Sequence, residues 1–454
     1  MNTRYSWSMN RSLVVAISLF ATPCVALAAS GPRAYVTNSL SDNVSVIDLT
    51  TNTVVGLPIP VGIGPVKVAI TPDGNTAYVV NSRTGSDNVS AIDLTTNTVV
   101  GSPIPVGFNP LDIAITPDGT TAYVVNNSPD NVSVLDLTTN TVVGSPIPVG
   151  TNPSGIAITP DGNTAYVPNF LSDDVSVIDL TTNTVVGLPI LVGIKPHDIA
   201  ITPDGNTAYV VNIGSGNVSV INLTTNAVVG SIHVGSGPWR IAITPDGSTA
   251  YVAVSGRHEI SMIDVATNAV VGTIPVINPS SIAFTPDGTT AYVVISQPYT
   301  IVSVIDVAAR AVVGTIPVGN GPSGITIALF NPVLPIDIDI KPNSDPNSIN
   351  LCSNGAVPIA ILGSGTLDVL DINTDSLRFA DASIKVVGRK DPHQLCSYED
   401  VNGDFITDLV CHFLTTDIAG IDGESSFATL NGELGGGTAI EGSDSVNIVK
   451  DTCK

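Results

Sequence analysis

The feature that most constrains this 454-residue chain is an internal repeat. The triplet Ala-Tyr-Val occurs seven times, and successive copies lie 41 to 45 residues apart. Each copy continues into a segment like NVSVIDLTTN, then VVG, IPVG and a proline, and finally IAITPDG. The copies begin at Ala34, Ala77, Ala122, Ala165, Ala208, Ala250 and Ala291. Self-similarity at this period predicts repeated supersecondary units that bury their cores against one another.

Each repeat reads as four short strands. IAIT is a short apolar run, TAYVVN follows it, VSVIDL alternates with a period of two, and TVVGSIPV completes the unit. The intervening TPDG and LTTN segments carry the Pro, Gly, Asp and Asn residues that tight turns prefer. Only 12% of the residues are charged, whereas 43% are hydrophobic, which suffices for a large core. We therefore expect an all-β fold whose repeats are four-stranded antiparallel blades of a β-propeller.

The two ends of the repeat array complement each other. The first triplet, at Ala34, has no inner strand before it, and the segment Pro322-Ser323-Gly324-Ile325-Thr326-Ile327 is an inner strand with no blade after it. We expect a seven-bladed propeller that this last strand closes, because closure removes exposed sheet edges. An open solenoid would leave both partial units unexplained.

These motifs resemble the YVTN family of β-propeller repeat proteins, over about residues 33–331. AYVVN, TPDG, VSVIDLTTN and IPVG all recur in order, although Ala253-Val254 and Val294-Ile295 replace Val-Asn in the last two repeats. The resemblance implies a secreted or surface location and a binding role. The resemblance does not imply any particular reaction for this chain.

Residues 1–28 have the features of a signal peptide. Arg4 and Arg11 flank the start of an apolar stretch, and Ala26-Leu27-Ala28 fits a cleavage site. We expect a mature chain that begins at Ala29 and is secreted, extracellular or at the cell surface, with the periplasm as an alternative. An uncleaved anchor helix is the other interpretation, which the shortness of the stretch disfavours. Since no later stretch is as apolar over such a length, we expect no membrane span in the mature chain.

The formal net charge of −23 excludes one class of partner. A chain this acidic does not bind nucleic acid or anionic lipid through general electrostatics. The charge is suited instead to solubility or to calcium binding.

Sequence variation distinguishes the two faces of the expected propeller (residues 29–331). The TPDG and LTTN turns, on one face, barely change, whereas the loops after the second strand and the connections into each blade, on the other, vary. We call the second one the variable face. Next to the blade-entry prolines we expect a ring of ligand-binding residues at the channel mouth: Lys67, Asp112, His197, Asp198, Trp239 and Arg240. The alternative is that these positions differ only because repeats diverge in sequence, and that His197 and Trp239 merely fill the channel.

Residues 332–454 are expected to form a small C-terminal β-sandwich-like domain. Its motifs IDIKPNSDPNSINL, VPIAILGS and DVNGD resemble a module of secreted bacterial proteins. Four cysteines in an exported chain indicate disulfides, and three connectivities exist. A hairpin between Cys396 and Cys411 favours that pair, which leaves Cys352–Cys453. A metal site of four thiolates is the less favoured reading.

The segment between the paired cysteines has the spacing of a calcium loop. Oxygen ligands from Asp400, Asn402, Asp404 and Asp408, with the carbonyl of Ile406, could surround one Ca²⁺. The spacing resembles the calcium loops of dockerins and integrin-type propellers, but Cys411 replaces the usual Glu and Phe405 the usual Gly. An acidic hairpin without metal is the alternative. We expect a structural role for the ion.

Catalytic motifs are absent from the sequence. It contains five His, of which only His197 lies at the expected mouth, and it has no His pair at metal-ligand spacing, no Gly-rich phosphate loop and no nucleophilic Ser motif. We predict a non-enzymatic binding or scaffold protein that recognises a protein or glycan at a cell surface. The alternative is a propeller hydrolase or lyase that uses Asp112, His197, Asp198 and Arg240 at the channel mouth.

Overall fold

The computed structural model describes residues 31–328 except Thr84, together with the strands and some adjoining residues of 334–448. The described residues are all-β: they contain no α-helix, and only Ser255–Arg257 (η1) and Val369–Asp371 (η2) form 3₁₀ turns. None of these described segments is a helix of the length and apolarity needed to cross a membrane.

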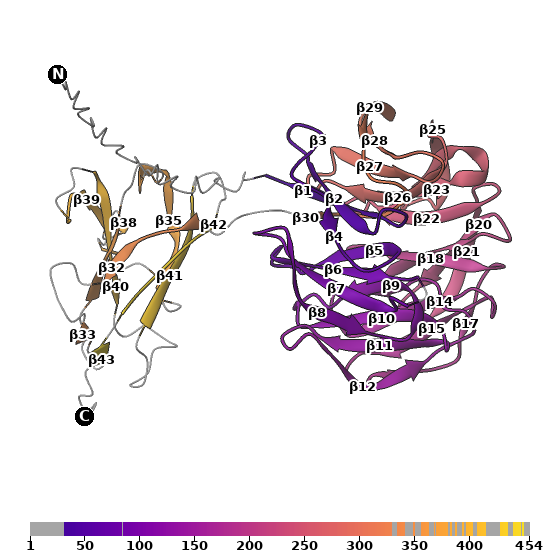
Figure 1. Ribbon diagram of the computed structural model, residues 1–454, viewed down its shortest axis with the longest axis horizontal. Helices are drawn as coiled ribbons and strands as arrows, with labels where there is room; N and C mark the ends of the chain where they lie inside the picture. The colour runs from indigo at the N-terminus through magenta and orange to yellow at the C-terminus, as the bar shows by residue number, and fades with distance from the viewer. Residues whose placement is uncertain are drawn as a thin grey trace, which may run out of the picture.

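Residues 33–328 form antiparallel sheets that follow one another along the chain (Figure 1). The first sheet contains β1 (Arg33–Asn38), β2 (Asn43–Asp48), β3 (Thr53–Val54) and β4 (Ile59–Pro60). The next two are β5 (Pro65–Ile70), β6 (Thr76–Asn81), β7 (Asn88–Asp93), β8 (Thr98–Pro105), and β9 (Phe108–Ile115), β10 (Thr121–Ser128), β11 (Asn131–Asp136), β12 (Thr141–Pro148). The fourth is β13 (Ala157–Ile158), β14 (Thr164–Asn169), β15 (Asp174–Asp179), β16 (Thr184–Val185) and β17 (Ile190–Leu191).

The remaining blades repeat this order. The fifth is β18 (Pro196–Ile201), β19 (Thr207–Asn212), β20 (Asn217–Asn222) and β21 (Ala227–His233). The sixth is β22 (Pro238–Ile243), β23 (Thr249–Val254), β24 (Glu259–Asp264) and β25 (Ala269–Pro275). The seventh is β26 (Pro279–Phe284), β27 (Thr290–Ile295), β28 (Ile301–Asp306) and β29 (Ala311–Pro317). The last strand, β30 (Pro322–Ala328), pairs antiparallel with β1 (Figure 1).

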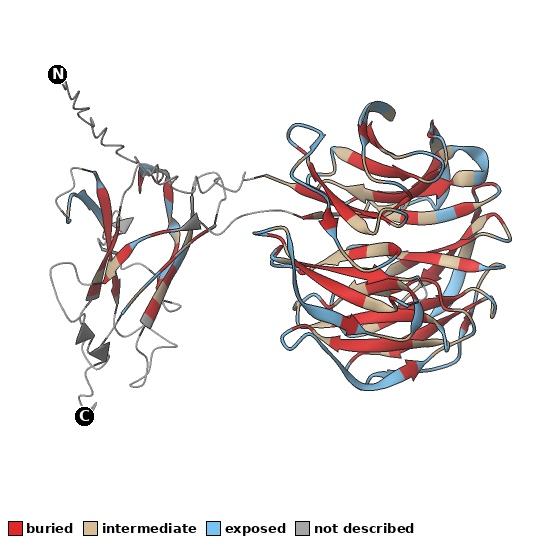
Figure 2. Cartoon of the chain, in the orientation of Figure 1, coloured by how far each residue is buried: buried red, intermediate tan, exposed pale blue. Residues whose placement is uncertain are grey.

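The core lies between consecutive blades. The Ala-Tyr-Val strand of each blade is buried on both faces, and its side chains pack with those of the following blade; Tyr35 and Val44, for example, share a cluster with Val79 and Ile92. Figure 2 shows buried residues along the inner strands and exposed residues along the outer ones. Because both faces of these strands are covered, their sequence is continuously apolar rather than alternating.

A tyrosine–asparagine contact connects neighbouring blades. The Tyr35 hydroxyl donates to Asn97 Oδ1 at 3.0 Å, and the Tyr292 hydroxyl donates to Asn52 Oδ1 at 2.6 Å between the last blade and the first. Equivalent contacts join Tyr78 to Asn140, Tyr123 to Asn183, Tyr166 to Asn226 and Tyr209 to Asn268. The bonds satisfy hydroxyl groups that blade packing buries.

The C-terminal region contains two main sheets. One is formed by β31 (Leu334–Pro335), β42 (Ala439–Ser445), β41 (Phe427–Leu434), β35 (Ile372–Phe379) and β36 (Ala382–Ser383), and the other by β32 (Ile338–Ile340), β34 (Ala356–Ile361), β40 (Asp408–Leu414) and β39 (Cys396–Glu399). Two short ladders pair β33 (Ser348–Ile349) with β43 (Asn447–Ile448), and β37 (Val386–Val387) with β38 (His393–Gln394). Phe379 of one main sheet and Phe413 of the other belong to a single hydrophobic cluster, so the two sheets share one core.

Candidate functional site

The predicted mouth residues lie on the innermost strands, one or two residues after the blade-entry prolines. Lys67 is in β5, Asp112 in β9, and His197 and Asp198 in β18; Trp239 and Arg240 are in β22. In β18, for example, the blade-entry proline Pro196 is already paired with Asn212, so the strand begins there.

A β-bulge sets the direction of these side chains. In β18 the register passes from Pro196 to Asp198, and in β22 from Pro238 to Arg240, so His197 and Trp239 are the extra, unpaired residues. Such bulges redirect side chains and occur often beside functional sites. The following residues, Asp198 and Arg240, are paired again, with Val211 and Ala253 of the neighbouring strands.

Four charged mouth residues contact one another. Lys67 Nζ lies 3.2 Å from Asp112 Oδ1, and Arg240 Nη1 lies 3.6 Å from Asp112 Oδ2 and 3.1 Å from Asp198 Oδ1. We call this set the charge network. Since Asp112 belongs to the third blade and Arg240 to the sixth, the network bridges blades that are not neighbours. Its two positive and two negative charges cancel.

The carboxylates of the charge network are deeply buried and bonded. Asp112 is 1% exposed and accepts the Ile113 N–H, while Asp198 is 5% exposed and accepts the Ile241 N–H at 2.9 Å. Burial alone would raise the pKa of Asp198, but the Arg240 and Lys67 cations outweigh it and lower that pKa below its ordinary value. The carboxylates of both aspartates are therefore bonded to groups of the protein itself, as expected of buried charges with a structural role.

His197 and Trp239 form an aromatic pair beside this network. Their ring centroids lie 4.1 Å apart, and His197 Nδ1 lies 2.9 Å from the Trp239 carbonyl oxygen. Burial, followed by the nearby Arg240 cation, lowers the pKa of His197 to about 4, so the ring is neutral at pH 7. A carbonyl can only accept, so the Nδ1–H donates and the other ring nitrogen carries the lone pair. Phe170 also approaches His197 in an edge-to-face arrangement, with ring centroids 6.4 Å apart.

A pocket of about 380 Å³ adjoins Trp239. It is lined, besides Trp239, by residues of the sixth, seventh and first blades: Ser39, Ser255, Pro279, Ser280, Ser296, Gln297, Gly321, Pro322 and Ser323. Sequence reasoning did not select these serines. The repeat alignment could have indicated two of them. Ser280 and Ser323 occupy the same repeat position in their blades as His197 and Trp239 do in theirs.

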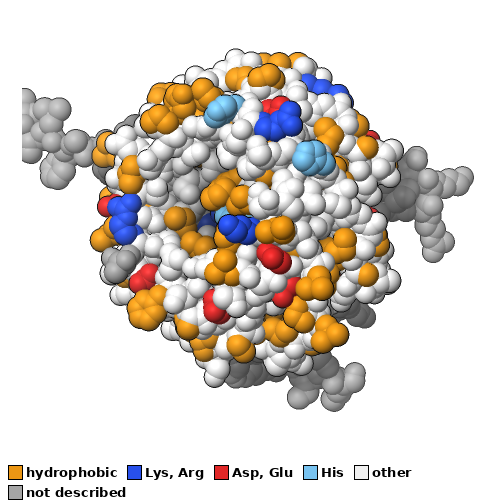
Figure 3. Space-filling view, turned by 90° about the vertical axis from the view of Figure 1, so that its right-hand side faces the viewer, with side chains coloured by type: hydrophobic (Ala, Val, Ile, Leu, Met, Phe, Trp, Pro, Cys, Tyr) orange, Lys and Arg blue, Asp and Glu red, His pale blue; other side chains and the backbone are white. Residues whose placement is uncertain are grey.

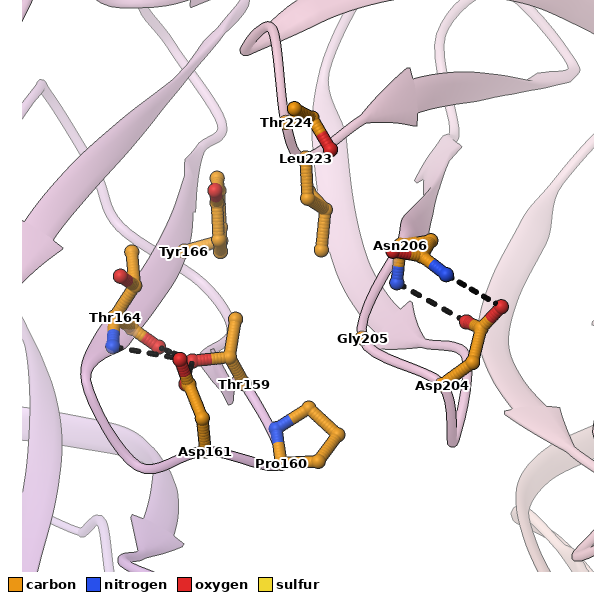
Figure 4. A pocket seen from close by; sticks show the side chains of 10 residues that line it. All are labelled: Thr159, Pro160, Asp161, Thr164, Tyr166, Asp204, Gly205, Asn206, Leu223 and Thr224. Atoms are coloured by element: carbon orange, nitrogen blue, oxygen red, sulfur yellow. Dashed lines mark hydrogen bonds between the residues drawn. The ribbon is translucent and has the colours of Figure 1, made fainter.

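A pocket of about 520 Å³ opens between two TPDG turns on the opposite face (Figure 4). Its carboxylates are occupied by their own turns: Asp204 accepts both the backbone N–H and the side-chain amide of Asn206, and Asp161 accepts the Thr159 hydroxyl (Figure 4). Similar pockets lie between other TPDG turns. This hollow is a product of the repeat, so we do not assign it a ligand.

The predicted calcium loop is described only in part. Asp400, Asn402, Ile406 and Asp408 are described, whereas Asp404 lies outside the described residues. Asp408 is fully buried, and its Oδ2 accepts the Val401 N–H at 2.9 Å. Among the described side chains, no group of three or more His, Cys, Asp or Glu is placed to hold a metal ion.

The predicted Cys396–Cys411 disulfide is confirmed. The two residues lie directly opposite each other on β39 and β40, with Cα atoms 4.2 Å apart. Cys352 and Cys453, the other expected pair, lie outside the described residues.

Comparison with known proteins identifies the family. Residues 11–332 match the YNCE-like beta-propeller family, so the chain belongs to that family. The match confirms the β-propeller fold expected from the repeats, while the assignment to YVTN repeats stays a prediction. No curated protein matches the chain.

Solved structures with this fold have diverse roles. Hydrazine synthase of Kuenenia stuttgartiensis is 26% identical with a TM-score of 0.52, over 58% of this chain and 89% of that one. A functionally unknown protein from Desulfotomaculum acetoxidans is 21% identical with a TM-score of 0.59, over 65% and 98%. The dihydro-heme d1 dehydrogenase NirN, in complex with DHE, is 20% identical with a TM-score of 0.51, over 64% and 74%. The last two likenesses show the fold alone.

Proposed function

We propose that this protein is a non-enzymatic binding protein, secreted or held at a cell surface, that recognises a protein or glycan through the variable face of its propeller. The observation that carries the proposal is the difference between the two faces. The TPDG turns repeat one hydrogen bond, from the threonine hydroxyl to the aspartate, from blade to blade. The variable face presents a different set of side chains in every blade.

Large apolar side chains are exposed in the loops and blade entries of the variable face. Phe108 is 69% exposed, Leu171 60% and Trp239 39%. The others are Leu40, Ile63, Ile194, Ile277 and Tyr299. Figure 3 shows a face with a central hollow that contains Lys or Arg side chains, with hydrophobic side chains scattered around it. Exposed aromatic residues on a rigid scaffold are typical of binding surfaces.

The proposed scaffold is a closed seven-bladed ring over residues 29–331, followed by a separate domain over 332–454. Closure is supported by the antiparallel pairing of β30 with β1 and by the Tyr292–Asn52 hydrogen bond between the last and first blades. A closed ring holds the variable loops at fixed mutual distances, which lowers the entropic cost of binding.

The alternative, a hydrolase or lyase at the channel mouth, would use the charge network and His197. Both aspartates of that network are engaged by Arg240 and backbone amides. The contacts of His197 keep its ring packed against Trp239. These contacts favour a structural role for the mouth charges over acid–base work.

We further propose that Asp400, Asn402, Asp404, Ile406 and Asp408 hold a structural Ca²⁺, and that Cys352 pairs with Cys453. The buried Asp408 at the start of β40 and the nearby Cys396–Cys411 disulfide support a rigid loop at this place. Metal analysis of the purified protein and of Asp404→Ala tests both the loop and the enzyme alternative. One calcium that the variant loses supports the loop, whereas a transition metal that the variant keeps would favour an enzyme.

The binding proposal is tested with fluorescently labelled protein and intact cells of the source organism. We expect saturable binding that Phe108→Ser with Leu171→Ser reduces at least tenfold. The matched control is Val100→Ser with Val143→Ser, which removes two exposed apolar side chains (38% and 39%) from outer strands. Equal loss in both double variants, or no binding by the natural protein, would contradict the proposal.

A further inference from the structure

We propose that the pocket beside Trp239 binds a neutral saccharide, with the indole as its platform and the surrounding serines as its hydrogen-bonding groups. This inference rests on the proposed binding function and names the ligand class for one part of the variable face. We call this site the Trp239 pocket, with the lining residues given above.

The indole of Trp239 lies between two different environments. His197 of the fifth blade packs against it at 4.1 Å, whereas the pocket is built by the sixth, seventh and first blades, beyond Trp239 in blade order. Trp239 is nevertheless 39% exposed and lines the pocket, so part of an aromatic surface that packs against His197 is still available to a ligand. A fixed, half-exposed aromatic ring offers contact area at little entropic cost.

The hydroxyl hydrogens of three serines in the pocket already form hydrogen bonds with the protein backbone. The hydroxyls of Ser39, Ser255 and Ser296 donate to backbone carbonyls of Gly321 (2.9 Å), Gly237 (3.0 Å) and Asn278 (3.1 Å). Each oxygen keeps its lone pairs and can accept a hydrogen bond from a ligand hydroxyl. The pocket therefore presents acceptors in fixed positions.

Ser280 provides a hydroxyl group that is free to bind a ligand in the pocket. It is only 7% exposed and lines the pocket, yet its hydroxyl takes part in none of the hydrogen bonds among residues 31–328. The Ser280 hydroxyl is not among the buried polar atoms that lack a partner, so it is open to the pocket and can exchange hydrogen bonds with a ligand. In the equivalent position of the fourth blade, Ser154 donates to the Pro196 carbonyl oxygen at 3.2 Å.

The absence of charge defines the class of ligand. No Asp, Glu, Lys, Arg or His lines the pocket, and the nearby Arg240 is already paired with Asp198. A phosphate or carboxylate would lose its hydration here without gaining a counterion. A neutral, polyhydroxylated ligand gains hydrogen bonds from the serines and packs its C–H face on the indole. The volume of about 380 Å³ is at the lower end of ligand pockets, which suits the terminal part of an oligosaccharide.

The chain carries its own reporter for this test. It contains two tryptophans, Trp7 and Trp239, so the full chain with Trp7→Phe has a single indole, at the pocket. We expect a saturable fluorescence change on titration with at least one of four neutral hexasaccharides, of glucose (α- or β-linked), xylose or N-acetylglucosamine. We expect none with oligogalacturonate, which carries carboxylates.

Variants identify the groups responsible. Ser280→Ala should weaken the saccharide at least tenfold without lowering the melting temperature, because the hydroxyl makes no internal bond. Ser82→Ala, on the same face but in the blade of β5–β8 and outside the pocket, should leave the affinity unchanged. Equal affinity of Ser280→Ala and the natural protein would overturn the inference, as would tighter binding of oligogalacturonate.

A competition experiment separates this inference from the proposed function. The neutral hexasaccharide that binds should displace the labelled protein from intact cells. If the protein binds cells through the variable face but none of the four saccharides changes the fluorescence or competes, the saccharide inference is wrong and the binding function stands. If the protein does not bind cells at all, the proposed function itself fails.

Discussion

At the scale of single residues, a left-handed backbone position explains why one asparagine recurs in the repeat. The turn before each outer strand has φ near +50°, with Asn52, Asn97 and Asn140 among its occupants. Asparagine tolerates this conformation better than other non-glycine residues. Its side chain also accepts the tyrosine hydroxyl of the preceding blade. The last repeat departs from this rule, because Arg310 holds φ 53° and Tyr251 lacks an asparagine partner.

Arg310→Asn should therefore stabilise the protein by about 1 kcal/mol, through a better left-handed residue and a hydrogen bond from Tyr251. Denaturant unfolding of the variant measures the gain. The reverse change, Asn183→Arg, should cost a similar amount because it removes the Tyr123 contact. A gain from Asn183→Arg, or a loss from Arg310→Asn, would refute the explanation.

At the scale of elements, the TPDG turns act as small hydrogen-bonding units. Asp118 accepts the Thr116 hydroxyl and the Thr120 N–H, and these bonds lower the pKa of its carboxyl below 3.8. Eleven aspartates have a lowered pKa, six in the TPDG turns and five at the ends of the VSVID-type strands that precede the other turn. The same local chemistry thus recurs in every blade.

These shifts predict how stability depends on pH. A carboxyl with a lowered pKa stabilises the fold above its unfolded value of 3.8 and loses that contribution as the pH falls through the folded value. His197, whose pKa falls from 6.5 to about 4, adds an earlier loss as the pH drops from 6.5. We expect the melting temperature to be highest near neutral pH, to decline slightly below pH 6.5 and to fall steeply below about pH 4. An equal melting temperature at pH 3 and pH 7 would contradict this.

At the scale of the whole molecule, the pairing of β1 with β30 joins the two ends of the repeat array. Ile325 of β30 packs with Ala34 and Val36 of β1 and with Tyr292 of the seventh blade. Without β30, β1 would present an unpaired edge and its neighbours would lose part of their core.

A chain that ends at Gly321 should therefore melt well below a chain that ends at Asn331, and should aggregate. Both lack the C-terminal region, so the difference isolates β30. Circular dichroism melting and size-exclusion chromatography measure the two properties. Equal melting temperatures would show that closure contributes little to stability.

The sequence determined the blade by itself, because each of its strands and turns depends on neighbouring residues. The alternation of VSVID, the turn chemistry of TPDG and the regular spacing of Ala-Tyr-Val all act locally, and they predicted the four-stranded antiparallel units. The hairpin that aligns Cys396 with Cys411 was predictable for the same reason.

Only the tertiary structure decided what the mouth residues contact. The sequence indicated that Lys67, Asp112, Asp198 and Arg240 lie near the channel, but their pairing depends on which blades face each other across it. The Trp239 pocket likewise unites three blades whose serines are separated by up to 284 residues in the sequence, from Ser39 to Ser323. Such contacts depend on how sheets that are far apart in the sequence pack together and on the bulges in strands such as β18 and β22, which no local pattern specifies.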